Sequence, residues 1–164
     1  MKLLFVHISI LLFSSKMMAQ STLPIVAIKS IDGKEISTKN LIDSNRLTVI
    51  SFWASWCKPC MQELDAISED YDNWVQKSGS KVIAISIDDS RTFTAVKNVV
   101  TGRGWPFDAY IDVSQNLKRA LNITTVPYTI VIDKKGNIIK KNASYTPGSE
   151  AELLNFLIKY AAKK

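Results

Sequence analysis

The sequence predicts an α/β sandwich whose central sheet is largely parallel, with antiparallel character at one edge. Three apolar runs rich in β-branched residues, at 47–53, 81–87 and 128–132, have the composition of strands buried on both faces. Segments with helical spacing of apolar residues separate these runs, and this alternation favours parallel strands joined by helices. The 164 residues are enough for one domain, and neither a repeat nor a Pro/Gly/Ser-rich linker divides them.

The first half of the expected domain is a hairpin, a buried strand and a helix. Residues 23–38 indicate the hairpin, because the turn Asp32-Gly33 separates two short β-type segments. After the strand at 47–53, apolar residues fall at spacings of three and four from Cys60 to Gln76. This spacing predicts a single helix, which Gly79 ends before the strand at 81–87.

The second half continues the alternation of helices and strands. The expected elements are a helix at 91–101, a strand at 107–111, a helix at 114–121, the strand at 128–132, a turn at 135–137 and a strand at 138–140. Ser149 begins a final helix, and Glu152 stands three residues later, where a capping box places it.

The N-terminal residues have the pattern of an export signal. Lys2 precedes an apolar run from Leu3 to Phe13, and Ala19 is a small residue at a plausible cleavage point. We therefore expect a signal peptide at residues 1–19 and one domain at residues 20–164. An uncleaved interfacial helix is the alternative. Cleavage would remove two lysines and lower the formal net charge from +6 to about +4.

Composition excludes several classes of function. The single histidine, His7, lies in the expected signal, so the exported protein has no residue for a Ser-His-Asp triad, a Cys-His pair or a histidine metal site. The lysines occur as scattered pairs and do not form a basic stripe interleaved with aromatic residues. We expect no binding of nucleic acid.

Cys57 and Cys60 are the two cysteines, and they lie where a buried strand gives way to a helix. A disulfide that closes so short a loop stabilises a fold by only about 2 kcal/mol. A tetrahedral zinc site needs four ligands, of which this pair supplies two. A redox pair is the favoured interpretation, while a structural disulfide and a metal site stay open.

The position of the pair suggests how a redox pair would work. Unpaired N–H groups and the dipole at a helix N-terminus favour an anion, so we expect the pKa of Cys57 to lie below the usual 8.5 or so and Cys57 to be the nucleophile. Cys60, one turn into the helix, would be more buried and resolve the mixed disulfide. Lys58 adds a weak positive influence, and Pro59 is tolerated so early in a helix.

The segment Trp56-Cys57-Lys58-Pro59-Cys60, directly after the strand, resembles the active-site segment of the thioredoxin superfamily. Val126-Pro127-Tyr128, before the third buried strand, stands where that family carries its cis-proline. The resemblance implies that Pro127 is cis and packs against the thiols. It also implies that backbone next to Pro127 pairs with an extended substrate. Trp56, Lys58, Pro59, Val126 and Tyr128 are then the candidate substrate contacts.

The export signal, the N-terminal hairpin and an extra helix and strand between residues 90 and 111 are similar to the exported TlpA/ResA-like branch. That branch implies a thioredoxin-like three-layer sandwich with a mixed central sheet. Glu63 matches the glutamate that this branch carries near its thiols, and the resemblance implies that Glu63 relays protons and tunes the thiols during exchange. The alternative role for Glu63 is a negative charge that complements the helix N-terminus. Thioredoxins carry a buried Asp where this chain has Ser51, and the Phe-Pro that often follows the glutamate is replaced by Leu64-Asp65.

The resemblance implies an exported thiol–disulfide oxidoreductase in the periplasm or at the outer face of a bacterial cytoplasmic membrane. It would act on protein thiols or disulfides, as a reductant of the cytochrome c maturation type or a general one. A membrane thiol donor would recharge it. We expect a monomer with no cofactor or metal besides the Cys57–Cys60 disulfide. Alternatives are an oxidant or isomerase, a thiol peroxidase (disfavoured by Ala54, three residues before Cys57), a copper metallochaperone and a redox-silent binding module.

Overall fold

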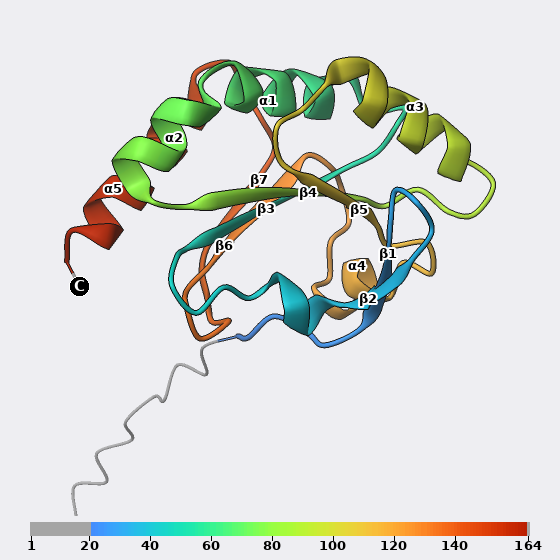
Figure 1. Ribbon diagram of the computed structural model, residues 1–164, viewed down its shortest axis with the longest axis horizontal. Coiled ribbons are helices and arrows are strands. Elements are labelled where there is room, and N and C mark those ends of the chain that lie inside the picture. Colours follow the sequence, from blue (N-terminus) through green and yellow to red (C-terminus); the bar gives the residue numbers. More distant parts are fainter. Residues whose placement is uncertain (1–20, 164) are drawn as a thin grey trace, which may run out of the picture.

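Seven strands form one mixed sheet across residues 21–163, the part of the chain that the computed structural model describes (Figure 1). The strands are β1 (Ala27–Ser30), β2 (Glu35–Ser37), β3 (Thr48–Trp53), β4 (Lys81–Ser86), β5 (Asp108–Ile111), β6 (Tyr128–Ile132) and β7 (Ile138–Ala143). Their order is β2-β1-β5-β4-β3-β6-β7. β3, β4 and β5 are parallel, and the other pairings are antiparallel. The parallel centre is confirmed, with antiparallel strands on both sides of it rather than at one edge.

Helices cover the two faces of the sheet. They are the 3-10 helix η1 (Thr38–Leu41) and the α-helices α1 (Lys58–Glu69), α2 (Tyr71–Ser78), α3 (Phe93–Arg103), α4 (Asn116–Ala120) and α5 (Ser149–Ala161). In Figure 1, α1, α2 and α3 lie over one face, and α4 lies at the other. α5 packs against α1 and α2. All six residues of β3 are buried, as expected of a strand between two layers.

The helix predicted from Cys60 to Gln76 is wrong in one respect, because the chain forms two helices there. Asp70, with φ −112° and ψ 18°, separates α1 from α2. The Asp70 carbonyl still accepts the Trp74 N–H at 3.0 Å, and Trp74 remains buried. The spacing of apolar residues therefore continues across the break and conceals it.

The start of the last helix also differs from the prediction. Gly148, with φ +98°, is the residue before the first turn of α5, and no side chain caps it. The Ser149 hydroxyl donates to the Thr146 carbonyl at 2.8 Å, and the Glu150 carboxylate accepts the Gly148 N–H at 3.0 Å. The expected capping box between Ser149 and Glu152 is wrong, since Ser149 already lies inside the helix.

Aromatic rings connect the sheet to the helical layer next to the cysteines. Trp53 of β3 meets Trp105 edge-on at 5.1 Å between ring centroids, and Trp105 stacks on Phe107 at 5.9 Å. Phe107 in turn meets Tyr71 of α2 at 5.6 Å. This chain of contacts fixes α2 and the end of β3 relative to each other.

No helix within residues 21–163 has the length and apolar character needed to cross a lipid bilayer. The expected signal peptide at residues 1–19 lies outside the described residues.

Candidate active site

A disulfide between Cys57 and Cys60 lies at the start of α1, with an S–S distance of 2.01 Å. Cys57 is the N-cap residue of α1, and its Sγ accepts the Cys60 N–H at 3.3 Å. The Cys57 N–H donates to the Ala54 carbonyl at 2.9 Å, which holds the turn that leaves β3. Cys57 keeps 5% of its surface exposed and Cys60 none. A partner can therefore reach the pair only from the Cys57 side.

Glu63 is the buried acidic residue of this site, with 6% of its surface exposed. Its Oε2 accepts the Ser51 hydroxyl and its Oε1 the Thr129 hydroxyl, both at 2.9 Å. Ser51 of β3 and Thr129 of β6 are direct cross-strand partners, so two neighbouring strands hold one carboxyl between them. Burial raises the pKa of Glu63, the two hydroxyls oppose this, and the charge of Glu150 raises the pKa further.

Glu63 does not complement the helix N-terminus. The first turn of α1 carries no acidic residue, and Glu63 comes later, one turn after Cys60. Residues three apart on a helix lie on the same face, so the carboxyl and the Cys60 thiol are neighbours there. The buried residues of α1 thus include both Cys60 and Glu63.

The Val126–Pro127 peptide bond is cis, the form that the resemblance implies. Pro127 is buried, and Val126 and Tyr128 are half-buried. Tyr128 pairs with Phe52 near the end of β3, and the chain continues from there to Cys57. The sheet register therefore brings the start of β6 to the same end of the molecule as the disulfide.

The candidate contacts next to the cysteines are exposed. Trp56 keeps 68% of its surface exposed, and Lys58 and Pro59 are also exposed. Trp53, by contrast, is fully buried against Trp105 and belongs to the core. Three exposed side chains thus flank Cys57, the cysteine of the pair that keeps some exposed surface.

Asp88 and Thr129 are residues of this region that the sequence analysis missed. Asp88 follows β4, is 4% exposed, and accepts the Ser55 N–H and hydroxyl at 2.8 and 2.7 Å. Ser55 stands two residues before Cys57, so Asp88 anchors the turn that presents the disulfide. Its position after a buried parallel strand was an available signal, since functional residues gather at that end of α/β sheets. Thr129 gives no such signal, because it lies inside an apolar strand.

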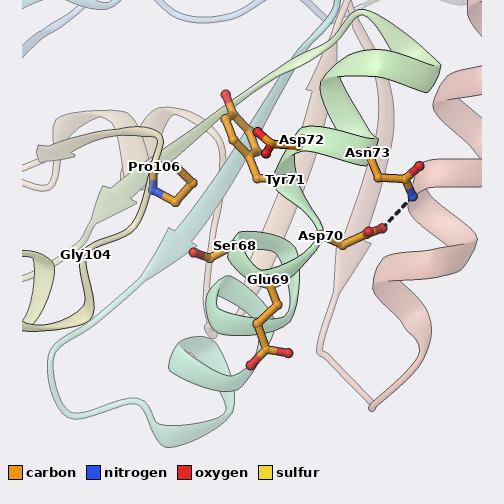
Figure 2. Close-up of a pocket in the computed structure, with 8 residues that line it drawn as sticks. All are labelled: Ser68, Glu69, Asp70, Tyr71, Asp72, Asn73, Gly104 and Pro106. Atoms are coloured by element: carbon orange, nitrogen blue, oxygen red, sulfur yellow. Dashed lines mark hydrogen bonds between the residues drawn. The ribbon is translucent and has the colours of Figure 1, made fainter.

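A surface pocket of about 450 Å³ lies away from these residues. Figure 2 shows it between the α1–α2 junction and the segment before β5, with the Asp70 carboxylate bonded to the Asn73 amide. It is lined by Ser68, Glu69, Asp70, Tyr71, Asp72, Asn73, Gly104 and Pro106. None of these is a predicted site residue. Thiol–disulfide exchange needs access to one sulfur and not an enclosed cavity, so the absence of the cysteines from this pocket is consistent with that chemistry.

Comparison with known proteins assigns the chain to a family. Residues 19–141 match the AhpC/TSA family. The chain belongs to this family. It is also similar to thiol-disulfide oxidoreductase ResA of Bacillus thuringiensis (strain Al Hakam), with 31% identity over 126 residues, 77% of this chain and 70% of the relative. Sporulation thiol-disulfide oxidoreductase A of Bacillus subtilis (strain 168) is 28% identical over 112 residues, 68% of this chain and 66% of that one.

A solved structure supports the fold directly. A thioredoxin-like protein from Porphyromonas gingivalis superimposes with a TM-score of 0.76 and 36% identity, covering 86% of this chain and 92% of the other. The predicted thioredoxin-like sandwich with an N-terminal β1–β2 hairpin is confirmed. This AhpC/TSA member is a thiol–disulfide oxidoreductase of the ResA type, and Cys57–Cys60 is its disulfide.

Proposed function

We propose that this oxidoreductase is exported and reduces disulfides in other proteins, with Cys57 as the nucleophile and Cys60 as the resolving thiol. The observation that carries the proposal is the position of Cys57 at the N-cap of α1, with Cys60 fully buried behind it. The N–H groups and dipole of the helix end stabilise a thiolate on Cys57. Burial of Cys60 keeps it from meeting a substrate first.

The reaction proceeds in two exchanges. The Cys57 thiolate attacks one sulfur of a substrate disulfide; the substrate S–S bond breaks, a mixed disulfide forms, and the released substrate thiolate takes up a proton. Cys60 then loses its proton and attacks Cys57 Sγ. The mixed disulfide breaks, the second substrate thiolate leaves and is protonated, and the Cys57–Cys60 disulfide remains. The two electrons that reduce the substrate come from the two enzyme thiols.

Glu63 is the group proposed to receive the Cys60 proton. It lies on the same helix face as Cys60, and burial raises the pKa of its carboxyl towards the range of a thiol. A smaller difference between the pKa values of donor and acceptor makes the transfer less unfavourable. The Ser51 and Thr129 hydroxyls hold the carboxyl in place and stabilise its ionised form, which is the form that accepts the proton.

Cysteine variants test the assignment of roles. We expect Cys57→Ser and Cys60→Ser to lose insulin-disulfide reduction, while Cys60→Ser accumulates mixed disulfides that a non-reducing gel detects. Trapping by Cys57→Ser in place of Cys60→Ser would reverse the two roles. Activity that survives in either variant would contradict the two-thiol mechanism.

The reduction potential tests the direction of electron flow. Equilibration of the Cys57–Cys60 pair with a thiol redox buffer should give a value nearer to that of thioredoxin, about −270 mV, than to that of a strong oxidant, about −120 mV. A value at the oxidising end would make the protein a donor of disulfides. Each 30 mV or so corresponds to about 1.4 kcal/mol for this two-electron couple, so the measurement separates the two cases well.

Export and recharging complete the proposal. The pattern at residues 1–19 supports an extracytoplasmic location, in the periplasm or at the outer face of the cytoplasmic membrane, where a reductant must be re-reduced. We propose a membrane thiol protein as that donor, and the disulfide of an apocytochrome c cysteine pair as one substrate class. Without a donor, we expect each reduced enzyme molecule to reduce one substrate disulfide and the reaction then to stop.

A further inference from the structure

Asp65 joins α1 to the segment between α3 and β5. Its Oδ1 accepts the indole N–H of Trp105 at 2.9 Å, and its Oδ2 forms an ion pair with Arg103 Nη1. Arg103 is the last residue of α3, which lies over the same face of the sheet as α1 (Figure 1). Proline, the residue that often stands here in the TlpA/ResA-like branch, has no side-chain acceptor for either donor. Asp65 therefore fixes the Arg103 guanidinium beside α1.

The Arg103 guanidinium also contacts a sulfur atom. Its Nη2 donates to Met61 Sδ at 3.5 Å, and Met61 stands one helical turn before Asp65. The Met61 N–H in turn donates to the Cys57 carbonyl at 3.2 Å, so Cys57 stands one turn before Met61. Residues four apart lie on one face of a helix. Cys57, Met61 and Asp65 thus share one stripe of α1, and Arg103 lies alongside the last two.

Met61 supplies the single thioether of residues 20–164, because the other methionines of the sequence are Met1, Met17 and Met18. Its side chain is half-buried. In the disulfide form the two cysteine sulfurs are bonded to each other, so neither offers a thiolate to an oxidant. Met61 Sδ is then the sulfur of this domain that remains open to direct oxygen transfer.

We propose that Met61 is an oxidation site for hydroperoxides, and that Arg103 assists the reaction and binds the sulfoxide. The sulfur attacks one peroxide oxygen with a lone pair; the S–O bond forms and the O–O bond breaks. The other oxygen takes up the proton and leaves as water, or as an alcohol from an organic hydroperoxide. The sulfur loses two electrons and the peroxide gains them. Methionine sulfoxide reductases can return the product to methionine.

The Arg103 guanidinium is placed to favour this reaction. An oxygen added to Met61 Sδ on the side of Nη2 comes within hydrogen-bond reach of a donor that is already 3.5 Å from the sulfur. Negative charge builds up on the peroxide oxygens as their bond breaks, and a donor held in place by Asp65 stabilises that charge without first reorganising. Arginine stays charged at every pH of interest, so the donor is always present.

Competition for hydrogen peroxide tests the assistance. The disulfide form of the full chain is mixed with an equal concentration of N-acetylmethionine amide and treated with less peroxide than either. Peptide mass spectrometry then measures the oxygen gained by Met61 and by the small competitor. A half-buried thioether without help reacts more slowly than a free one, because less of it meets the oxidant. We expect Met61 to react at least as fast as the competitor. A slower reaction at Met61 would overturn the proposal.

Arg103→Gln and Arg91→Gln separate the role of Arg103 from the loss of a positive charge. Each change removes an arginine that is paired with an aspartate, Asp65 for Arg103 and Asp89 for Arg91, but the structure records a bond to Met61 for Arg103 and none for Arg91. We expect Arg103→Gln to slow the oxidation of Met61 by about three- to tenfold, the effect of one hydrogen bond in the transition state. Arg91→Gln should match the wild type. Equal rates in all three proteins, or a faster rate in Arg103→Gln, would show that Arg103 does not assist.

Thermal unfolding of the fully oxidised proteins tests the bond to the sulfoxide. Oxidation should lower the Tm of Arg103→Gln by about 4 °C more than that of the wild type, because the new oxygen then lacks its donor. Arg91→Gln should lose no more than the wild type. Met61→Leu is the control for oxidation elsewhere, and its Tm should not change on treatment. Equal losses of Tm in Arg103→Gln and the wild type, or a loss in Met61→Leu as large as that in the wild type, would contradict the proposal. None of these measurements uses disulfide exchange, so their outcome is independent of the proposed function.

Discussion

Asp88 offers the sharpest test of how the fold presents its disulfide. Its Oδ2 accepts the Ser55 N–H at 2.8 Å and the Ser86 hydroxyl at 2.6 Å, and its Oδ1 accepts the Ser55 hydroxyl at 2.7 Å. Three donors from two chain segments thus converge on one buried carboxylate. The perturbation is Asp88→Ala, which leaves all three without their acceptor.

The size of the effect follows from these bonds. A hydrogen bond to a charged group contributes about 1.5–3 kcal/mol to stability, but the two Ser55 bonds are not independent, and removal of a buried charge offsets part of the loss. We expect Asp88→Ala to lower the free energy of unfolding by about 2–4 kcal/mol. For a protein of this length that corresponds to a fall in Tm of roughly 5–15 °C.

Two matched variants make the result interpretable. Asp88→Asn can still accept the Ser55 N–H with its amide oxygen and donate its NH₂ to the Ser55 hydroxyl, so it should cost only about 1 kcal/mol. Asp89→Ala removes the neighbouring carboxylate, which bonds to exposed Arg91, and should change stability by less than about 1 kcal/mol. Urea unfolding followed by tryptophan fluorescence measures all three. If Asp88→Ala were as stable as Asp89→Ala, the carboxylate would not hold the turn, and the reasoning would fail.

Further predictions concern Glu63 and one glycine. Thr129→Val removes a hydroxyl that lowers the pKa of Glu63, so stability should fall by about 1–2 kcal/mol, and by more at pH 8 than at pH 5, in urea unfolding. Glu63→Gln should become more stable relative to the wild type as pH rises. Folding raises the pKa of Glu63, so the protonated carboxyl stabilises the folded protein at low pH, and this contribution is lost as pH rises through the folded pKa. Glutamine does not titrate and has no such dependence. Parallel pH curves for the two proteins would count against this. Gly136→Ala should cost about 1–3 kcal/mol more than Gly33→Ala by the same assay, because both residues have φ +84° but only at Gly136 would a Cβ approach Ile42 Cδ1, at 2.7 Å. Equal costs would mean that Ile42 moves aside freely.

The central strands were predictable because burial on both faces leaves a direct mark on sequence. The runs 47–53, 81–87 and 128–132 correspond to β3, β4 and β6 with shifts of at most one residue at either end. A strand between two helical layers has no polar face, so its apolar run is continuous and long enough to recognise. The break at Asp70 leaves no such mark, because the apolar stripe of α1 and α2 continues through it.

Within the site, the residues that lie close together in the sequence were predictable, whereas the contacts that depend on how β3 and β6 pair were not. Cys57, Cys60 and Glu63 lie in one segment, so their spacing places them on α1 without knowledge of the sheet. The carboxyl of Glu63 gains Thr129 as its second partner only because β6 pairs with β3 in the register that sets Thr129 opposite Ser51. A shift of one residue would turn the Thr129 hydroxyl to the other face, and no pattern in the sequence fixes that register.

The position of Ser51 explains how this site can do without an acid on its strand. Thioredoxins have a buried Asp at that position, and here the Ser51 hydroxyl donates to the Glu63 carboxyl at 2.9 Å. The carboxyl therefore lies beside the usual place but is carried by the helix. A carboxyl on α1 is fixed relative to Cys60, one turn away, and its second oxygen is bonded to Thr129, two residues after the cis Pro127. Glu63 thus shares its helix with Cys60 and is bonded to the strand that follows Pro127.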